Sequence, residues 1–272
     1  MIKQAIIPLA GLGTRMLPLT SVMPKELLPI NGKPNVQYIM DECIEAGINQ
    51  FIFIISKKKN SIKKYFFNDS FYESIIKKKK DKRIINEFKK IKKYQKMIKF
   101  VYQESPKGTG DAVLKCKKLI KGKYFLILLP DDLIINKNCT KEMIRLHKKF
   151  KASVIATKTV NKKTVSRWGI LSITKKKKNY FQINNVIEKP NISNAPSNYA
   201  IIGRYILPYK IFNEIKKLKP KKGSEIHITD AIRNLIKNGE NFLGNIFRGK
   251  YLDCGTLKGY INSGVEISKG KR

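Results

Sequence analysis

The sequence lacks the features of a disulfide-stabilised or zinc-stabilised protein and those of a membrane protein. Its four cysteines lie far apart and form no C-x-x-C pair, which argues against a disulfide framework and against a zinc site. They are Cys43, Cys116, Cys139 and Cys254. The N-terminal apolar stretch is short and is interrupted by Pro8, so it does not resemble a signal peptide. The longest apolar run elsewhere, 124–130, falls far short of the roughly 20 residues of a membrane-spanning helix. We therefore expect a cytoplasmic protein with no membrane partner.

Acidic residues are scarce beside basic ones. The 57 Lys and Arg residues against 20 Asp and Glu residues give a formal net charge of +37, a balance typical of proteins that bind polyanions. Many of the lysines, however, stand in low-complexity runs such as KKKK at 77–80 and 175–178, which usually form solvated faces. The basic stretch 78–93 contains only one aromatic residue, Phe88, for stacking on a base. We expect no specific nucleic acid partner, and a basic polynucleotide-binding protein remains the non-enzyme alternative.

Apolar runs and helical periodicity alternate along the 272 residues, with no linker and no repeat. Buried strands are expected at 4–10, 51–56, 99–104, 123–132, 153–160 and 199–207, and a hairpin is expected over 170–190. Helices are expected from Pro34 to Gly47, after Pro208, and over 230–238 with Thr229 as its cap. This order predicts a single α/β domain, 1–272, with a Rossmann-like, mixed, mostly parallel central sheet flanked by helices. Its ligand should lie beyond the carboxyl ends of the strands.

A glycine loop follows the first strand in the stretch GLGTRMLPLTSVMPKELLP, residues 11–29. Gly11 and Gly13 would let a ligand approach the backbone closely. The dinucleotide fingerprint fails because Met16 stands where its third glycine is due, and no Gly-Lys-Ser/Thr closes a Walker loop. Arg15 and Lys25 could bring a guanidinium fork and a point charge onto one polyphosphate, although both could also be surface cations of a lysine-rich chain.

This stretch resembles the signature of the sugar nucleotidyltransferase family, most of all its bacterial UTP–glucose-1-phosphate uridylyltransferases. The resemblance extends over some 260 residues, through the motifs KGTGDAV, LPDDLI, WGIL, VIEKP, PSNYAIIGRYIL, EIHITDAI and DCGTLKGY. It implies the nucleotide-diphospho-sugar transferase fold, with a nucleotide-binding part at about 1–135 and a sugar-binding and C-terminal part at about 136–272. It also implies a homo-oligomer, either a dimer or a tetramer.

The implied reaction transfers UMP from UTP to α-D-glucose 1-phosphate and gives UDP-glucose and pyrophosphate. The sugar phosphate attacks the α-phosphorus in line, assisted by Mg²⁺, and it needs no protein base because a phosphate monoester is ionised above a second pKa of about 6. Transfer from dTTP or another nucleoside triphosphate to a hexose 1-phosphate is the alternative reaction.

The resemblance also assigns roles to residues. Catalytic roles fall to Arg15, Lys25 and Lys189; nucleotide binding falls to Ala10, Gly11, Gly13, Gln103 and Gly108; sugar binding falls to Gly169, Glu188, Gly203 and Glu225; metal binding falls to Asp131 and Asp253. Asp132, beside Asp131, has no counterpart in the family pattern and is expected to be a bystander. Thr109 and Asp111 stand where the subfamily has leucine and histidine, which leaves the choice of nucleobase open.

Overall fold

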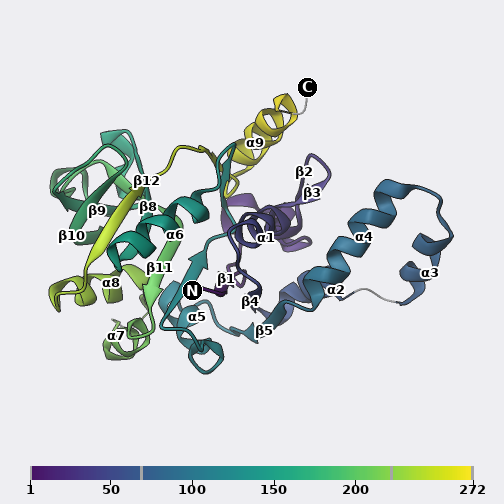
Figure 1. Ribbon diagram of the computed structural model, residues 1–272, viewed down its shortest axis with the longest axis horizontal. Coiled ribbons are helices and arrows are strands. Elements are labelled where there is room, and N and C mark those ends of the chain that lie inside the picture. Colours follow the sequence, from purple (N-terminus) through teal and green to yellow (C-terminus); the bar gives the residue numbers. More distant parts are fainter. Residues whose placement is uncertain (1, 68–69, 221–222, 271–272) are drawn as a thin grey trace.

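The protein is described by a computed structural model that covers residues 2–67, 70–220 and 223–270 (Figure 1). The main sheet has nine strands in the order β5-β4-β1-β6-β11-β8-β12-β10-β9. These strands are β1 Gln4–Pro8, β4 Gln50–Ile55, β5 Ile98–Tyr102, β6 Tyr124–Leu128, β8 Ser153–Thr159, β9 Gly169–Thr174, β10 Tyr180–Glu188, β11 Tyr199–Pro208 and β12 Phe242–Ile246. Two small antiparallel ladders pair β2 Pro29–Ile30 with β3 Lys33–Pro34, and β7 Asp132–Ile135 with β13 Lys250–Asp253.

The mixed α/β sheet expected from the sequence is confirmed. Its parallel character is concentrated in one half, where β5, β4, β1 and β6 are all parallel neighbours. In the other half β11 runs antiparallel to β6 and β8, and β10 runs antiparallel to β9 and β12. The apolar run at 123–132 thus becomes a strand with a parallel neighbour on one side and an antiparallel neighbour on the other.

Helices cover both faces of the sheet (Figure 1). In the described residues they are α1 Asn35–Glu45, α2 Asn60–Phe66, α3 Ser70–Lys78, α4 Lys82–Gln95, α5 Thr109–Lys115, α6 Cys139–Phe150, α7 Ile211–Lys217, α8 Ile228–Lys237 and α9 Leu257–Lys269. Strand β1 shows why two cores form, because its side chains alternate between the faces of the sheet. Ala5 and Ile7 pack into the core that α1 and α6 cover, whereas Ile6 packs into the core that α5, α7 and α8 cover.

Two predicted helix starts need correction. Helix α8 begins at Ile228 with His227 as its N-cap residue, and the side chain of His227 makes no capping hydrogen bond. Thr229 is therefore not the cap, and its hydroxyl bonds to Glu188 instead. Pro208 is the last residue of β11, and α7 begins three residues later at Ile211.

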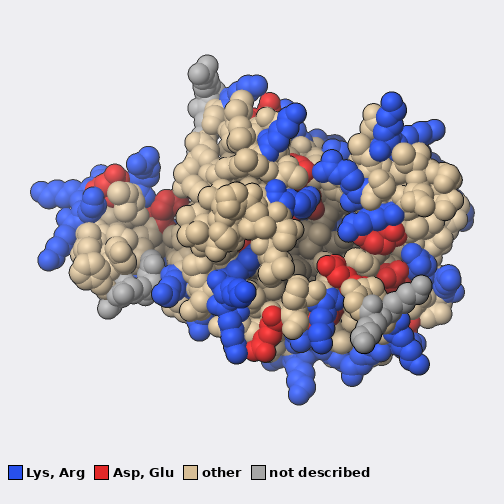
Figure 2. Space-filling view, turned by 180° about the vertical axis from the view of Figure 1, so that it is seen from behind, with Lys and Arg blue, Asp and Glu red and all other residues tan. Residues whose placement is uncertain are grey.

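The basic charge is spread over the surface. Figure 2 shows Lys and Arg side chains distributed across the whole of one face, with acidic side chains beside a hollow near its middle. The lysine-rich helices α3 and α4 extend to one side of the molecule (Figure 1), and Phe88 on α4 is only 8% exposed. The aromatic residue within the 78–93 stretch is thus packed inside and unavailable for stacking on a base. No helix among the described residues is long and apolar enough to cross a membrane.

Candidate active site

A cleft of about 560 Å³ opens where loops follow the strands of the parallel half and meet β10, β11 and β13. The predicted site residues come from loops far apart in the sequence, yet all but one line this cleft. They are Ala10, Gly11, Gly13, Arg15, Lys25, Gln103, Gly108, Asp131, Gly169, Glu188, Gly203, Glu225 and Asp253. The remaining residue, Lys189, is not in the lining. Its side chain is 58% exposed, and its Nζ lies 4.0 Å from Oε1 of Glu188.

Two cations meet one carboxylate at one end of the cleft. Lys25 Nζ forms an ion pair with Asp131 Oδ2, and Arg15 Nη2 lies 3.3 Å from the same oxygen. Lys25 is mostly buried, whereas the side chain of Arg15 is 56% exposed. Two positive charges are thus held together at this end of the cleft, an arrangement that suits an anionic ligand.

A buried ion pair supports the short helical turn Lys25–Leu27 that carries Lys25. Glu26 is 1% exposed, and Lys59 Nζ donates to both of its carboxylate oxygens at 2.8 Å. Burial raises the pKa of the Glu26 carboxyl, and the charge of Lys59 opposes that rise. Since Lys59 follows β4, the pair fixes the turn against the edge of the parallel strands.

The acidic residues converge through the β7–β13 ladder. Asp253 is paired in register with Asp132, and the backbone N–H of Cys254 donates to the carbonyl of Asp131 at 2.7 Å. The predicted metal-binding residues Asp131 and Asp253 therefore stand on adjacent segments, although 122 positions separate them in the sequence. Among the described residues no group of three or more His, Cys, Asp or Glu side chains could hold a metal ion.

Asp132, which we expected to be a bystander, also lines the cleft. It is buried, burial raises the pKa of its carboxyl to about 6, and Tyr251 donates its hydroxyl to Oδ1 at 2.7 Å. Gly203 lies against it. A Cβ at Gly203 would come within 2.3 Å of Asp132 Oδ2 and 2.7 Å of Leu129 Cβ. Packing against its own neighbours thus already requires glycine at position 203.

The predicted base-binding residue, Gln103, is 6% exposed at the end of β5. Its Nε2 donates to Asp111 Oδ2 at 2.7 Å and to the carbonyl of Gly108 at 3.2 Å. Gly108 has a φ of +97°, and a Cβ there would lie 2.5 Å from the carbonyl oxygen of Ile226. Only glycine allows this backbone conformation and this contact.

At the other end of the cleft Glu188 terminates β10. Its Oε2 accepts a hydrogen bond at 3.0 Å from the hydroxyl of Thr229, which is itself buried. Trp168 packs edge-on against Tyr251, with 6.1 Å between the ring centres, and both rings line the cleft. A carboxylate held in place beside aromatic rings suits a polyhydroxylated ligand, because the carboxylate can accept hydrogen bonds from hydroxyl groups.

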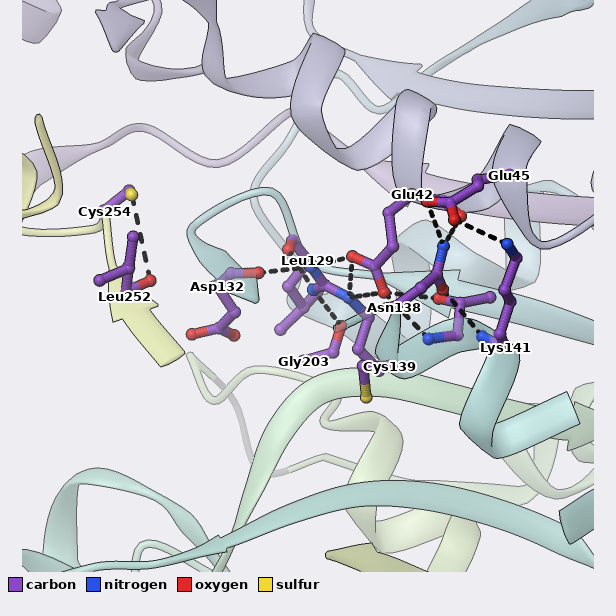
Figure 3. Close-up of polar contacts among 12 residues, drawn as sticks. Glu42, Glu45, Leu129, Asp132, Asn138, Cys139, Lys141, Gly203, Leu252 and Cys254 are labelled. Carbon is purple, nitrogen blue, oxygen red and sulfur yellow. Dashed lines mark hydrogen bonds and ion pairs between the residues drawn. The ribbon is translucent and has the colours of Figure 1, made fainter. Parts of the chain in front are cut away.

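A buried arginine supports the loop that carries Asp131, and Figure 3 labels three of its partners, Glu42, Leu129 and Asp132. Arg204 is fully buried and donates to the carbonyl oxygens of Leu129 and Asp132, at 3.0 and 2.5 Å. It also pairs with Glu42 on α1, with 3.0 Å between Nη2 and Oε2. Sequence reasoning missed this residue, although a single cation within the apolar strand YAIIGRYIL was a signal, since a buried charge needs a partner.

Neither histidine lines the cleft. His147 lies on α6, where its Nδ1 is 2.8 Å from the carbonyl of Ala152 and its ring packs on Tyr124. Any chemistry in this cleft therefore relies on the charged residues and backbone groups that line it.

The comparisons with known proteins agree with this arrangement. The model of the nucleotidyl transferase family matches residues 4–270. The UTP–glucose-1-phosphate uridylyltransferase of Pseudomonas aeruginosa is 37% identical over 271 residues, which cover 97% of this chain and 95% of that protein. The chain therefore belongs to the nucleotidyl transferase family.

Solved structures show the same similarity. A crystal structure of UDP-glucose pyrophosphorylase complexed with UDP-glucose superimposes with a TM-score of 0.87 at 36% identity and covers 100% of both chains. A UTP-bound UGPase from Acinetobacter baumannii superimposes with a TM-score of 0.89 at 31% identity, covering 98% of this chain and 93% of that chain.

Proposed function

We propose that the protein transfers UMP from UTP to α-D-glucose 1-phosphate, giving UDP-glucose and pyrophosphate. The observation that carries this proposal is that one cleft joins a cationic end, built on Lys25 and Arg15, to an end built on Glu188 and aromatic rings. Relatives with this fold are named for the same substrates. Transfer of another nucleotide, such as thymidylate, to a hexose 1-phosphate is the alternative that the same cleft would serve.

In the proposed mechanism the cationic end binds the triphosphate. Lys25 and Arg15 would bind its oxygens and stabilise the negative charge that grows on the departing pyrophosphate. Gly11 has open space on its Cβ side, since a Cβ there would meet no atom within 4 Å, so the protein itself does not require glycine at this position. We infer that the loop from Ala10 to Gly13 leaves room for the nucleotide, with its backbone amides facing the ligand.

The other end of the cleft would hold the sugar phosphate in line. Glu188, fixed by Thr229, would accept hydrogen bonds from glucose hydroxyls, with Gly169, Gly203 and Glu225 lining the same region. Lys189 lies outside the lining, so a role on the sugar phosphate requires its exposed side chain to turn toward the cleft. Holding two reactants in this geometry supplies much of the rate enhancement in such a step.

Magnesium fits the acidic residues near the cationic end. Mg²⁺ prefers oxygen ligands and takes few of them from protein, and Asp131 and Asp253 offer two carboxylates on adjacent segments. We propose that these two residues hold the ion, which when bound would neutralise charge on the phosphate oxygens. The dimer or tetramer expected from the resemblance stays a prediction.

The test is pyrophosphate release from UTP, dTTP, ATP, CTP and GTP in the presence of glucose 1-phosphate and Mg²⁺. We expect turnover with UTP and a loss of at least about a hundredfold in kcat for Lys25→Met, because losing one preorganised charge in such a site costs roughly 10²–10³. Lys64→Met, on the exposed surface of α2, is the matched control and should keep full activity. Preference for another nucleotide would favour the alternative, and no turnover with any nucleotide would refute the proposal.

A further inference from the structure

The side-chain amide of Gln103 is held by two acceptors. Its Nε2 carries two hydrogens, and it donates to Asp111 Oδ2 and to the carbonyl of Gly108. Both partners accept and neither donates, since a carboxylate and a carbonyl have no hydrogen to offer. The reversed amide would place Oε1 against two other oxygens, so this orientation is strongly favoured.

The elements around this amide are fixed independently. The backbone N–H of Gln103 donates to the carbonyl of Ile55 at 2.9 Å, which anchors it to β4. On the other side the N–H of Gly110 donates to the carbonyl of Ile226 at 2.7 Å. These backbone bonds fix the position of Asp111, in the first turn of α5, relative to Gln103.

Gln103 can therefore act toward a ligand only as a hydrogen-bond acceptor. Both amide hydrogens are used, and no described residue donates to Oε1, so Gln103 can only accept in the cleft that it lines. Uracil presents an N–H at ring position 3, whereas cytosine presents an unprotonated nitrogen there. An acceptor at this point favours the first and repels the second.

We propose that Asp111 is a specificity-determining residue that fixes the amide of Gln103 and thereby selects uracil over cytosine. This inference rests on the proposed function, because it takes a pyrimidine nucleotide as the ligand. Asp111 stands at one of the positions that depart from the subfamily pattern, and it acts through Gln103 without touching the base. Thymine presents the same N–H at ring position 3 as uracil, so the acceptor on Gln103 would not distinguish dTTP from UTP.

The test compares kcat/KM for UTP and CTP at saturating glucose 1-phosphate and Mg²⁺. In Asp111→Asn the acceptor of the shorter bond, at 2.7 Å, becomes an amide that can also donate to Oε1 of a turned Gln103, which then offers Nε2 to cytosine. Only the longer contact with the Gly108 carbonyl, at 3.2 Å, still opposes this turn. We expect the UTP/CTP ratio to fall about tenfold, the upper end of the range for one neutral hydrogen bond, while the UTP/dTTP ratio stays constant.

Lys115→Ala is the matched control. Lys115 Nζ lies 3.9 Å from the other oxygen of Asp111, so the variant removes a neighbouring charge and leaves the bond to Gln103 intact. It should keep the wild-type UTP/CTP ratio. A ratio in Asp111→Asn within twofold of the wild type would overturn the inference while the uridylyl-transfer proposal stood.

Binding supplies a second readout that needs no turnover. Calorimetry with UMP and CMP on the wild type and on Asp111→Ala should show a tenfold smaller preference for UMP in the variant, and an equal preference in both would refute the role of Asp111. If the wild type turned over none of the nucleotides, the proposed function would fail, and this binding comparison would still decide the inference.

Discussion

Arg204 on β11 and Glu42 on α1 form an ion pair inside the core, with 3.0 Å between Arg204 Nη2 and Glu42 Oε2. The pair joins a central strand to the helix that covers it, and the same guanidinium supports the Leu129–Asp132 loop. Glu42 is satisfied further by the hydroxyl of Thr140, at 2.7 Å from Oε1. The loop that brings Asp131 to the cleft is thus fixed from within the core.

Breaking this pair should strongly destabilise the protein. Arg204→Met leaves the Glu42 carboxylate buried without its counter-charge, so we expect the free energy of unfolding to fall by about 3–5 kcal/mol. Denaturant titration of the variant measures this. Arg248→Met, which breaks the surface pair with Glu142, is the control and should cost no more than about 1 kcal/mol. Equal losses of unfolding free energy in the two variants would show that the buried Arg204–Glu42 pair stabilises the protein no more than an exposed pair does.

Gly203→Ala tests the close packing beneath the cleft. The new methyl group would collide with Asp132 Oδ2 and with Leu129, so we expect a loss of roughly 1–3 kcal/mol in stability. Gly264→Ala on α9 meets no atom within 4 Å and should gain up to about 1 kcal/mol from helix propensity. Thermal unfolding of both variants measures the contrast, and a shift in the same direction for both would contradict it.

Thr229 should act on sugar binding through Glu188. Thr229→Val keeps the shape of the side chain and removes the hydroxyl, so Glu188 loses one hydrogen bond worth about 1 kcal/mol. The KM for glucose 1-phosphate should rise about fivefold while the KM for UTP stays constant. Thr229→Ser should restore the wild-type value. Equal changes in both KM values would indicate general damage to the cleft in place of a role for Glu188 on the sugar.

His147 should make the protein less stable in mild acid. Burial lowers its pKa below the usual 6.5, so between pH 7 and 5 the unfolded chain binds more protons than the folded one at this residue. Its contribution to stability is present above pH 6.5 and is lost as the pH falls. In His147→Gln the free energy of unfolding should therefore decline less between pH 7.5 and 5.5 than in the wild type. Denaturant titrations at both pH values measure this, and parallel declines would rule it out.

Much of the cleft could be predicted from the sequence because its residues stand in motifs that follow apolar strands. Arg15 and Asp131 follow the parallel neighbours β1 and β6, and the carboxyl ends of parallel strands meet at one edge of a sheet. Local patterns also located the strands themselves. The antiparallel pairing of β11 with β6 was not predictable in this way, because the direction of a strand depends on tertiary context.

The partners of these residues could not be predicted, because they depend on contacts between distant segments. The bond between Thr229 and Glu188 spans 41 positions, and local spacing instead indicated a helix cap at Thr229. Asp132 followed the predicted metal ligand directly, yet only its contact with Tyr251 shows how its carboxyl is held. For Lys189 the motif predicted a catalytic role. The structure places the residue outside the cleft lining, so this role remains a proposal.

The proposed reaction moves the α-phosphorus of UTP, together with its nucleoside, onto the sugar phosphate. The most direct test supplies UTP labelled at either the α- or the γ-phosphate, with glucose 1-phosphate and Mg²⁺, and locates the label in the products. We predict that the α-label appears in UDP-glucose and the γ-label in pyrophosphate, with both signals lost in Lys25→Met. Label from the γ-phosphate on the sugar, or no labelled product at all, would refute uridylyl transfer by this cleft.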